Sequence, residues 1–169
     1  MLIKGILSKI YFEFIQNGWL RSFIFKGCQD NKGNPLPLIT YPCIEYLESL
    51  DLCQLRILEI GSGYSTLFFA QRAKQIVSFE CDPKWFKKIT NKLIQLKLKQ
   101  RVNIEYVDIP KPFNPNDINF REITTAIYLN KIEKVVNSQK NKFDIILVDG
   151  WGYHRGKLSK FLLNYLADG

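Results

Sequence analysis

The sequence predicts an α/β fold with a doubly wound, mainly parallel sheet and an N-terminal helical extension. Short apolar runs alternate with stretches of helical spacing, and this alternation is typical of strands joined by crossover helices. The first apolar run leads into a glycine turn, and three later runs each end in an acidic residue. A chain of 169 residues with 46% hydrophobic residues fits one globular domain with a full core.

The first predicted strand and its glycine turn lie in residues 56–66, Arg-Ile-Leu-Glu-Ile-Gly-Ser-Gly-Tyr-Ser-Thr. Gly61 and Gly63 allow positive φ angles and the close approach of a ligand. Ser65 and Thr66 can cap the helix that follows. Helix-start N–H groups beside a turn without side chains form a lip suited to a nucleotide-sized ligand.

The second and third predicted strands each end in a carboxylate. The second, residues 75–82, contains Glu80, which lies 19 residues after Gly61. Doubly wound folds place the carboxylate that binds a ribose diol at this position. Residues 102–107 form an alternating strand that is followed by Asp108.

As a set, these features resemble the class I S-adenosylmethionine-dependent methyltransferases, whose signature is acid-x-Gly-x-Gly with acids after the second and third strands. The resemblance runs from residue 57 to the C-terminus. It implies a Rossmann-like sheet, S-adenosylmethionine as cofactor, Glu80 on the ribose and Asp108 toward the adenine. The predicted cofactor-binding residues are Glu59, Gly61, Ser62, Gly63, Ser65, Thr66, Glu80, Cys81 and Asp108.

A dinucleotide-binding protein of the NAD type is the competing interpretation. That fingerprint requires a third glycine three residues after the second, and Thr66 occupies the position. Glu59, an acid inside the apolar strand, would repel a pyrophosphate but attract a sulfonium and an ammonium group. The methyltransferase interpretation is therefore preferred.

The N-terminal third predicts an extension, residues 1–50, ahead of a cofactor-binding domain, residues 51–169. Residues 2–15 have helical spacing, but charged residues interrupt them too often for a transmembrane helix. This helix packs on the core, lids the site or lies on a membrane surface. A turn-rich stretch then leads into a helix over 43–50. A similar Pro-x-x-Thr-Tyr-Pro segment precedes the fold in a bacterial methyltransferase subgroup, so Thr40 and Tyr41 either sit near the cofactor mouth or pack a turn.

Charge and cysteine content narrow the partners and the compartment. The net charge is +8, yet the densest lysine group alternates with apolar residues over a predicted helix, 83–100. A solvated helix face explains it better than nucleic-acid binding. The cysteines form no C-x-x-C pair, and the chain has one histidine. We therefore expect no thiolate metal site and no disulfide framework, and we expect the protein to be located in a reducing cytoplasm.

A proline-rich loop and a predicted helix over 124–137 come before the fourth predicted strand, 143–148. Asp149 follows directly at the end of this strand. The resemblance implies that Asp149 faces the transferable methyl group and the acceptor. His154 lies in the following predicted loop, 151–156, and is either a catalytic base or a solvated side chain. Trp151 and Tyr153 are candidates for an acceptor wall. The resemblance includes catechol-type methyltransferases, which hold a divalent metal partly through the acid after the fourth strand. Their other metal ligands follow a fifth strand, which this chain lacks, so no metal is predicted.

The chain stops where the resemblance implies a fifth strand, after a predicted helix over 158–166. Strands 1–4 of a seven-stranded sheet are present and strands 5–7 are missing. The edge of 143–148 is then open to self-association or a partner chain. Two function classes follow: a small-molecule or sugar O- or N-methyltransferase, or a catalytically inert cofactor-binding subunit.

Overall fold

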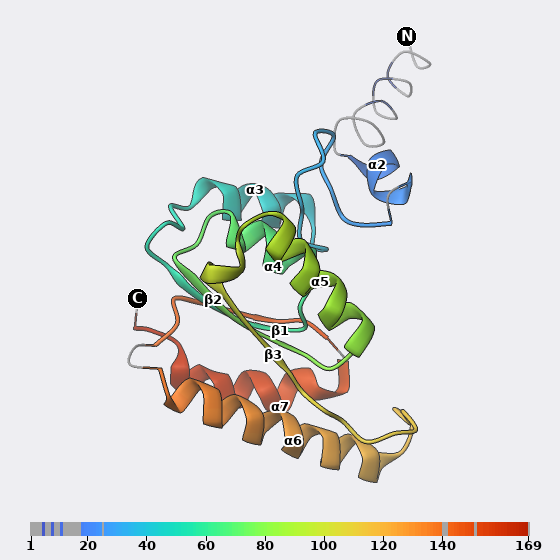
Figure 1. Cartoon of the computed structure of the whole chain (residues 1–169), viewed down its shortest axis with the longest axis vertical. Coiled ribbons are helices and arrows are strands. Elements are labelled where there is room, and N and C mark those ends of the chain that lie inside the picture. The colour runs from blue at the N-terminus through green and yellow to red at the C-terminus, as the bar shows by residue number, and fades with distance from the viewer. Residues whose placement is uncertain are drawn as a thin grey trace.

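A four-stranded sheet lies between two layers of helices (Figure 1). The computed structural model describes residues 18–24, 26–139, 142–150 and 152–168, together with residues 5, 8 and 11. One face of the sheet is covered by α3 (Tyr41–Ser49), α4 (Tyr64–Ala70) and α5 (Pro83–Gln95), and the other face by α6 (Ile118–Asn137) and α7 (Gly152–Leu162). The short helix α2 (Trp19–Ile24) lies away from the sheet.

All the strand pairs are parallel, and the strands follow the order β3-β2-β1-β4. The strands are β1 (Arg56–Ile60), β2 (Gln75–Glu80), β3 (Val102–Tyr106) and β4 (Ile145–Val148). The chain leaves β1 toward β2 on one side and returns to β1 with β4 on the other. The carboxyl ends of β1 and β4 therefore border the point where strand order reverses, which is where open α/β sheets bind ligands.

Each face of the sheet buries its own core. Ile57 and Ile76 join Phe68 and Ile89 in the core beneath α4 and α5. Leu58 and Val77, one residue along each strand, belong instead to the core beneath α6 and α7. Successive side chains of a strand point to opposite faces, so burial on both faces explains the continuous apolar runs of these central strands.

Several helices differ from their predicted bounds because caps and turns act locally. Helix α6 begins at Ile118, six residues before the predicted start, because the Asp117 carboxylate accepts hydrogen bonds from Asn119 N and Phe120 N. Helix α5 ends at Gln95, and Lys97 then takes a φ of 57°. Helix α7 begins at Gly152, so the loop predicted over 151–156 is wrong from Gly152 onward, and residue 151 lies outside the described residues.

The C-terminal end of the described chain returns to the outer side of the sheet. Phe143, predicted as the first residue of the fourth strand, forms an isolated parallel bridge with Leu166. Phe143 N donates to Tyr165 O at 2.9 Å, and Ala167 N donates to Phe143 O at 2.8 Å. A further parallel pairing thus starts beside β4, where the resemblance implies a fifth strand.

The N-terminal helix predicted over 2–15 lies outside the described residues apart from Gly5, Ser8 and Tyr11. Within the described part of the chain, no helix is long and apolar enough to cross a membrane.

Candidate functional site

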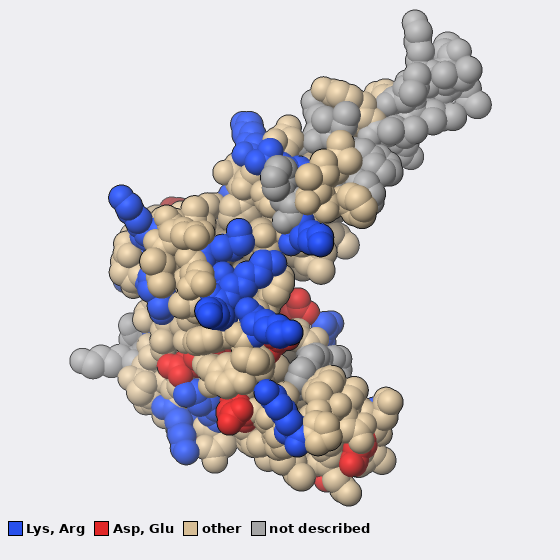
Figure 2. All heavy atoms as spheres, turned by 45° about the vertical axis from the view of Figure 1, so that its right-hand side comes forward, with Lys and Arg blue, Asp and Glu red and all other residues tan. Residues whose placement is uncertain are grey.

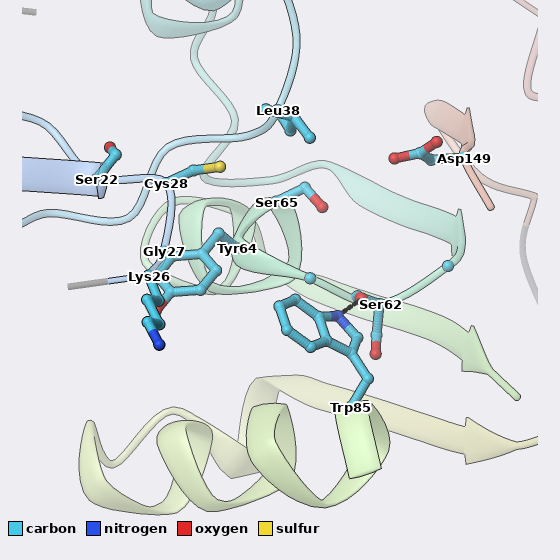
Figure 3. Close-up of a pocket in the computed structure, with 12 residues that line it drawn as sticks. Ser22, Lys26, Gly27, Cys28, Leu38, Ser62, Tyr64, Ser65, Trp85 and Asp149 are labelled. Atoms are coloured by element: carbon cyan, nitrogen blue, oxygen red, sulfur yellow. Dashed lines mark hydrogen bonds between the residues drawn. The ribbon is translucent and has the colours of Figure 1, made fainter. Parts of the chain in front are cut away.

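Two neighbouring cavities open at the carboxyl ends of β1, β2 and β4. The first, about 330 Å³, lies between the segment after α2 and the glycine turn, and Lys26, Cys28 and Tyr64 are among its lining residues (Figure 3). The second, about 240 Å³, lies beside the end of β2 and contacts Glu80 and Tyr128. Both cavities contact Gly61, Ser62, Trp85 and Asp149. An elongated ligand could therefore extend from one cavity into the other across the glycine turn.

Gly61 joins the two strand ends that border this site. Its φ is 90°, and a Cβ there would lie 3.0 Å from Asp149 O and 3.1 Å from Gly150 N. Its N–H donates to Phe79 O at 2.8 Å, while Asp149 N donates to Ile60 O at 2.9 Å. Both the left-handed conformation and the close approach of the β4 turn therefore require glycine.

Glu59 is fully buried, and its hydrogen bonds stabilise the glycine turn and the start of α4. Its Oε1 accepts from Ser65 Oγ at 2.5 Å, and its Oε2 accepts from Thr66 Oγ1 at 2.5 Å and from Ser78 Oγ at 2.8 Å. Thr66 Oγ1 in turn accepts from Gly63 N at 2.8 Å. Ser65 and Thr66 lie within the first turn of α4 and bind Glu59, whereas the residue at the N-cap position is Gly63.

Burial makes the Glu59 carboxyl harder to ionise. Desolvation raises the pKa of this carboxyl to about 7, against the opposing effect of its three hydroxyl donors. Glu59 does not line either cavity. Glu59 can therefore affect a ligand only by positioning the glycine turn through Ser65 and Thr66. Its assignment as a cofactor-binding residue stays a prediction.

We expect Glu59→Gln to alter the pH dependence of folding stability. The folded state keeps the Glu59 proton between about pH 4.5 and 7 while the unfolded state releases it, so the free energy of unfolding falls as pH rises through that window. The free energy of unfolding of the variant, taken relative to that of wild type, should therefore increase by on the order of 3 kcal/mol from pH 4.5 to pH 8. Denaturant unfolding of both proteins across this range measures the difference. Parallel profiles would contradict the raised pKa.

Glu80 is the buried carboxylate that reaches a cavity. It is 7% exposed, and its Oε1 accepts from Cys81 N at 2.7 Å and Asp82 N at 2.8 Å. Its Oε2 accepts from Ser62 Oγ at 3.1 Å. Burial raises the pKa of Glu80, and the three donors oppose that shift. Among the described hydrogen bonds Oε2 has a single donor, so it retains capacity to accept from a ligand hydroxyl.

Trp85 is a site residue that the sequence did not reveal. Its indole Nε1 donates to Ser62 O, a bond drawn in Figure 3, and the ring contacts both cavities. The position has a sequence explanation: Asp82 caps α5 through Lys84 N and Trp85 N, which places Trp85 in the first turn of α5, shortly after the end of β2. Cys81 is buried and lines the second cavity, and burial raises the pKa of its thiol to about 11.

Asp149 occupies the border between the cavities and is half exposed. Its Oδ1 accepts from Gly150 N at 2.8 Å and from Arg155 Nη2 at 2.7 Å. No described hydrogen bond engages its Oδ2. The arrangement fixes the carboxylate through one oxygen and leaves the other able to accept from a ligand.

His154 lies in the first turns of α7, where it is 3% exposed. Its Nδ1 is 2.6 Å from Thr125 Oγ1, and its ring packs 5.4 Å from that of Tyr128. Burial lowers the pKa of the imidazole to about 4, so the ring is neutral at pH 7. The solvated-loop alternative is therefore wrong. His154 does not line the cavities directly but packs behind Tyr128, which does.

Other candidates lie farther from the cavities. Asp108 is exposed beyond β3, Thr40 precedes α3, and Tyr41 is 37% exposed; none of them lines either cavity. Trp151 and the Tyr153 side chain lie outside the described residues. Among the described residues, no group of three His, Cys, Asp or Glu side chains could hold a metal ion.

Comparison with known proteins identifies the fold. Neither a family model nor a curated protein matches the sequence. The structure is similar to the O-methyltransferase TomG of Streptomyces achromogenes, involved in tomaymycin synthesis and solved with SAM, at 17% identity and a TM-score of 0.58. It is also similar to a Klebsiella pneumoniae protein assigned as an O-methyltransferase, at 24% identity and a TM-score of 0.50.

The matches cover 91% of this chain and 60% of TomG, and 68% of this chain and 44% of the Klebsiella protein. The chain thus spans less than two thirds of the length of either protein. At these identities the similarity confirms the predicted Rossmann-like fold, which this chain shares with O-methyltransferases.

Proposed function

We propose that this protein, which has the Rossmann-like fold of class I S-adenosylmethionine-dependent methyltransferases, methylates an oxygen or nitrogen of a small molecule or sugar. The observation that carries the proposal is the placement of Glu80, a buried carboxylate open to the cavity beside a glycine turn at the reversal of strand order. A ribose diol needs an acceptor of this kind at this place.

The residues of the site fit S-adenosylmethionine. Glu80 would accept hydrogen bonds from the ribose hydroxyls in the second cavity, where Cys81 and Tyr128 supply the walls. Gly61 and Gly63 would admit the amino-acid part toward the first cavity, since neither places a side chain on the turn. Asp108 remains a candidate for the adenine end, with a smaller effect because it is exposed.

When bound, the cofactor supplies a methyl group already activated by its sulfonium. The protein's task is then to orient the acceptor and exclude water. The Trp85 ring and the glycine turn form walls shared by the two cavities. Asp149 Oδ2 would accept the proton that the hydroxyl or amine of the acceptor loses on methylation. Arg155 and Gly150 N meanwhile donate hydrogen bonds to Asp149 Oδ1. His154, neutral at pH 7 and packed behind Tyr128, is the alternative proton acceptor.

We expect Asp149→Asn and His154→Gln to lower turnover while the dissociation constant of S-adenosylmethionine changes by less than about twofold. Groups that act mainly in the transition state lower kcat without weakening the ground-state complex. Calorimetry gives the affinity and a methyl-transfer assay gives kcat. A weaker cofactor complex would make Asp149 a binding residue, and an unchanged kcat for His154→Gln would leave that ring a packing role.

A turnover assay tests the function directly. The protein is incubated with methyl-labelled S-adenosylmethionine and a panel of hydroxyl and amine acceptors, and the formation of S-adenosylhomocysteine is measured. Acceptor-dependent product supports the proposal. Cofactor binding without turnover on any acceptor would favour the inert cofactor-binding subunit.

The N-terminal extension, residues 1–50, would act as a lid through its part before α3, because Lys26, Cys28 and Leu38 supply a wall of the first cavity. We also place the protein in the cytoplasm. The four cysteines are free thiols, which suits a reducing compartment.

We expect self-association or a partner chain at the outer edge of β4. Within the described chain β4 pairs only with β1, and its four apolar residues are half-buried. An open apolar edge is a template for pairing. Light scattering across a dilution series should show a mass that grows with concentration. A monodisperse monomer at high concentration would contradict this expectation.

A further inference from the structure

Lysine side chains lie close to two aromatic rings that line the first cavity, and Lys26, Lys88 and Lys92 are here called the lysine rim. Lys88 Nζ lies 4.1 Å from the Trp85 ring centroid and 5.5 Å from that of Tyr64, and Lys92 Nζ lies 5.4 Å from the Tyr64 centroid. Both rings line the cavity. Cation–π contacts therefore hold both ammonium groups against rings that form part of the cavity wall.

Lys26 approaches the same place from the N-terminal segment. Its carbonyl accepts from Lys88 Nζ at 3.5 Å, and its side chain lines the cavity with the ammonium directed toward α5 (Figure 3). Lys26 thus lines the first cavity, and Lys88 and Lys92 lie against the Trp85 and Tyr64 rings of its wall. Lys92 also lines a cavity of about 210 Å³ that shares Tyr64 with the first. Figure 2 shows Lys and Arg side chains gathered over α5 on this side of the molecule.

No carboxylate neutralises this group among the described residues. The ion pairs of the described chain join Arg72 to Glu48, Lys131 to Glu105, Lys142 to Asp168 and Arg155 to Asp149. Desolvation and the repulsion of Lys92 lower the pKa of Lys88, as expected for close cations without an acidic partner. An anion at this rim would relieve the repulsion.

We propose that the methyl acceptor is a small anion whose phosphate or carboxylate group is held by Lys26, Lys88 and Lys92. This proposal rests on the proposed function, because it assigns the outer part of the first cavity to the acceptor. The anionic group sits at the lysine rim, and the rest of the acceptor extends past Trp85 toward Asp149, which borders the same cavity.

The test compares two double variants on one helix. Lys88→Gln/Lys92→Gln removes the rim charges, and Lys84→Gln/Lys87→Gln removes two exposed charges from α5 with the same change in net charge. Wild type and both variants are titrated with sodium phosphate, and separately with benzoate, at constant ionic strength, and the Trp85 indole N–H resonance is followed by NMR. S-adenosylmethionine affinity is measured on the same samples by calorimetry.

We expect saturable anion binding that weakens at least about 10-fold in the Lys88/Lys92 variant and less than twofold in the Lys84/Lys87 variant. The stronger of the two anions identifies phosphate or carboxylate as the preferred group. Equal loss in both variants, or no anion binding by wild type, would overturn the proposal. So would weaker S-adenosylmethionine binding in the rim variant alone, because the lysines would then hold the cofactor's carboxylate. A wild type that binds anions but not S-adenosylmethionine would instead overturn the proposed function and, with it, the acceptor assignment.

Discussion

Replacing Gly61 by valine is expected to weaken S-adenosylmethionine binding by at least about 100-fold. A β-branched residue at a φ of 90° costs on the order of 1–3 kcal/mol in backbone strain. The added Cβ would also press on Asp149 O, 3.0 Å away, and on Gly150 N, 3.1 Å away. The turns after β1 and β4 would have to separate, and these turns border both cavities. Calorimetric titration of the variant measures the loss.

Two control variants separate strain from local crowding. Gly63→Ala adds a Cβ whose nearest neighbour, Ser65 Oγ, is 3.5 Å away, and the Gly63 φ of −167° suits any residue. It should fold normally, so a loss of affinity there reports a ligand close to the turn. Gly156→Ala, with open space around its Cβ, should leave affinity unchanged. If Gly61→Val binds the cofactor as wild type does, the glycine turn is not part of the binding site.

Replacing Glu80 by glutamine is expected to raise the S-adenosylmethionine dissociation constant by about 10- to 100-fold. Hydrogen bonds to a charged acceptor contribute roughly 1.5–3 kcal/mol. A glutamine Oε1 can still accept from Cys81 N and Asp82 N, so the turn after β2 should survive. What disappears is the charged oxygen available to the ribose diol.

Glu105→Gln is the matched control for this variant. Glu105 is on the adjacent strand β3, is ion-paired to Lys131 at 2.7 Å and lines neither cavity. The same change of charge there should leave the affinity within about twofold of wild type. Equal losses in the two variants would indicate a general charge effect, and no loss in Glu80→Gln would remove that residue from the cofactor site.

The strands and the glycine turn could be predicted from the sequence because their signals are local. Buried parallel strands read as apolar runs, and the order of strands, turns and acids fixes which ends meet at the carboxyl edge. This order places Gly61, Ser62 and Glu80 together at that edge. The same motif identifies Glu59 as a candidate, but it does not indicate what surrounds the carboxylate. Only the fold shows that Ser65, Thr66 and Ser78 enclose its carboxylate.

Other parts of the site depend on contacts between distant segments, which leave no sequence pattern. Trp85 looked like one apolar position of an amphipathic helix, yet it donates to Ser62 O across the site. The Lys26 side chain reaches the cavity from a segment before the domain, and His154 is buried only because Thr125 and Tyr128 of α6 pack against α7. The start of α5 after Asp82 agrees with the predicted helix, and the start of α6 after Asp117 could have been predicted from the same capping chemistry.

Titration of the wild-type protein with S-adenosylmethionine and, separately, with NAD by calorimetry tests the central claim most directly. The placement of Glu80 beside a turn that lacks the third glycine predicts saturable binding of S-adenosylmethionine, with one site per chain, and no detectable heat with NAD. Binding of NAD with no binding of S-adenosylmethionine would contradict the proposed cofactor and the methyltransferase function built on it.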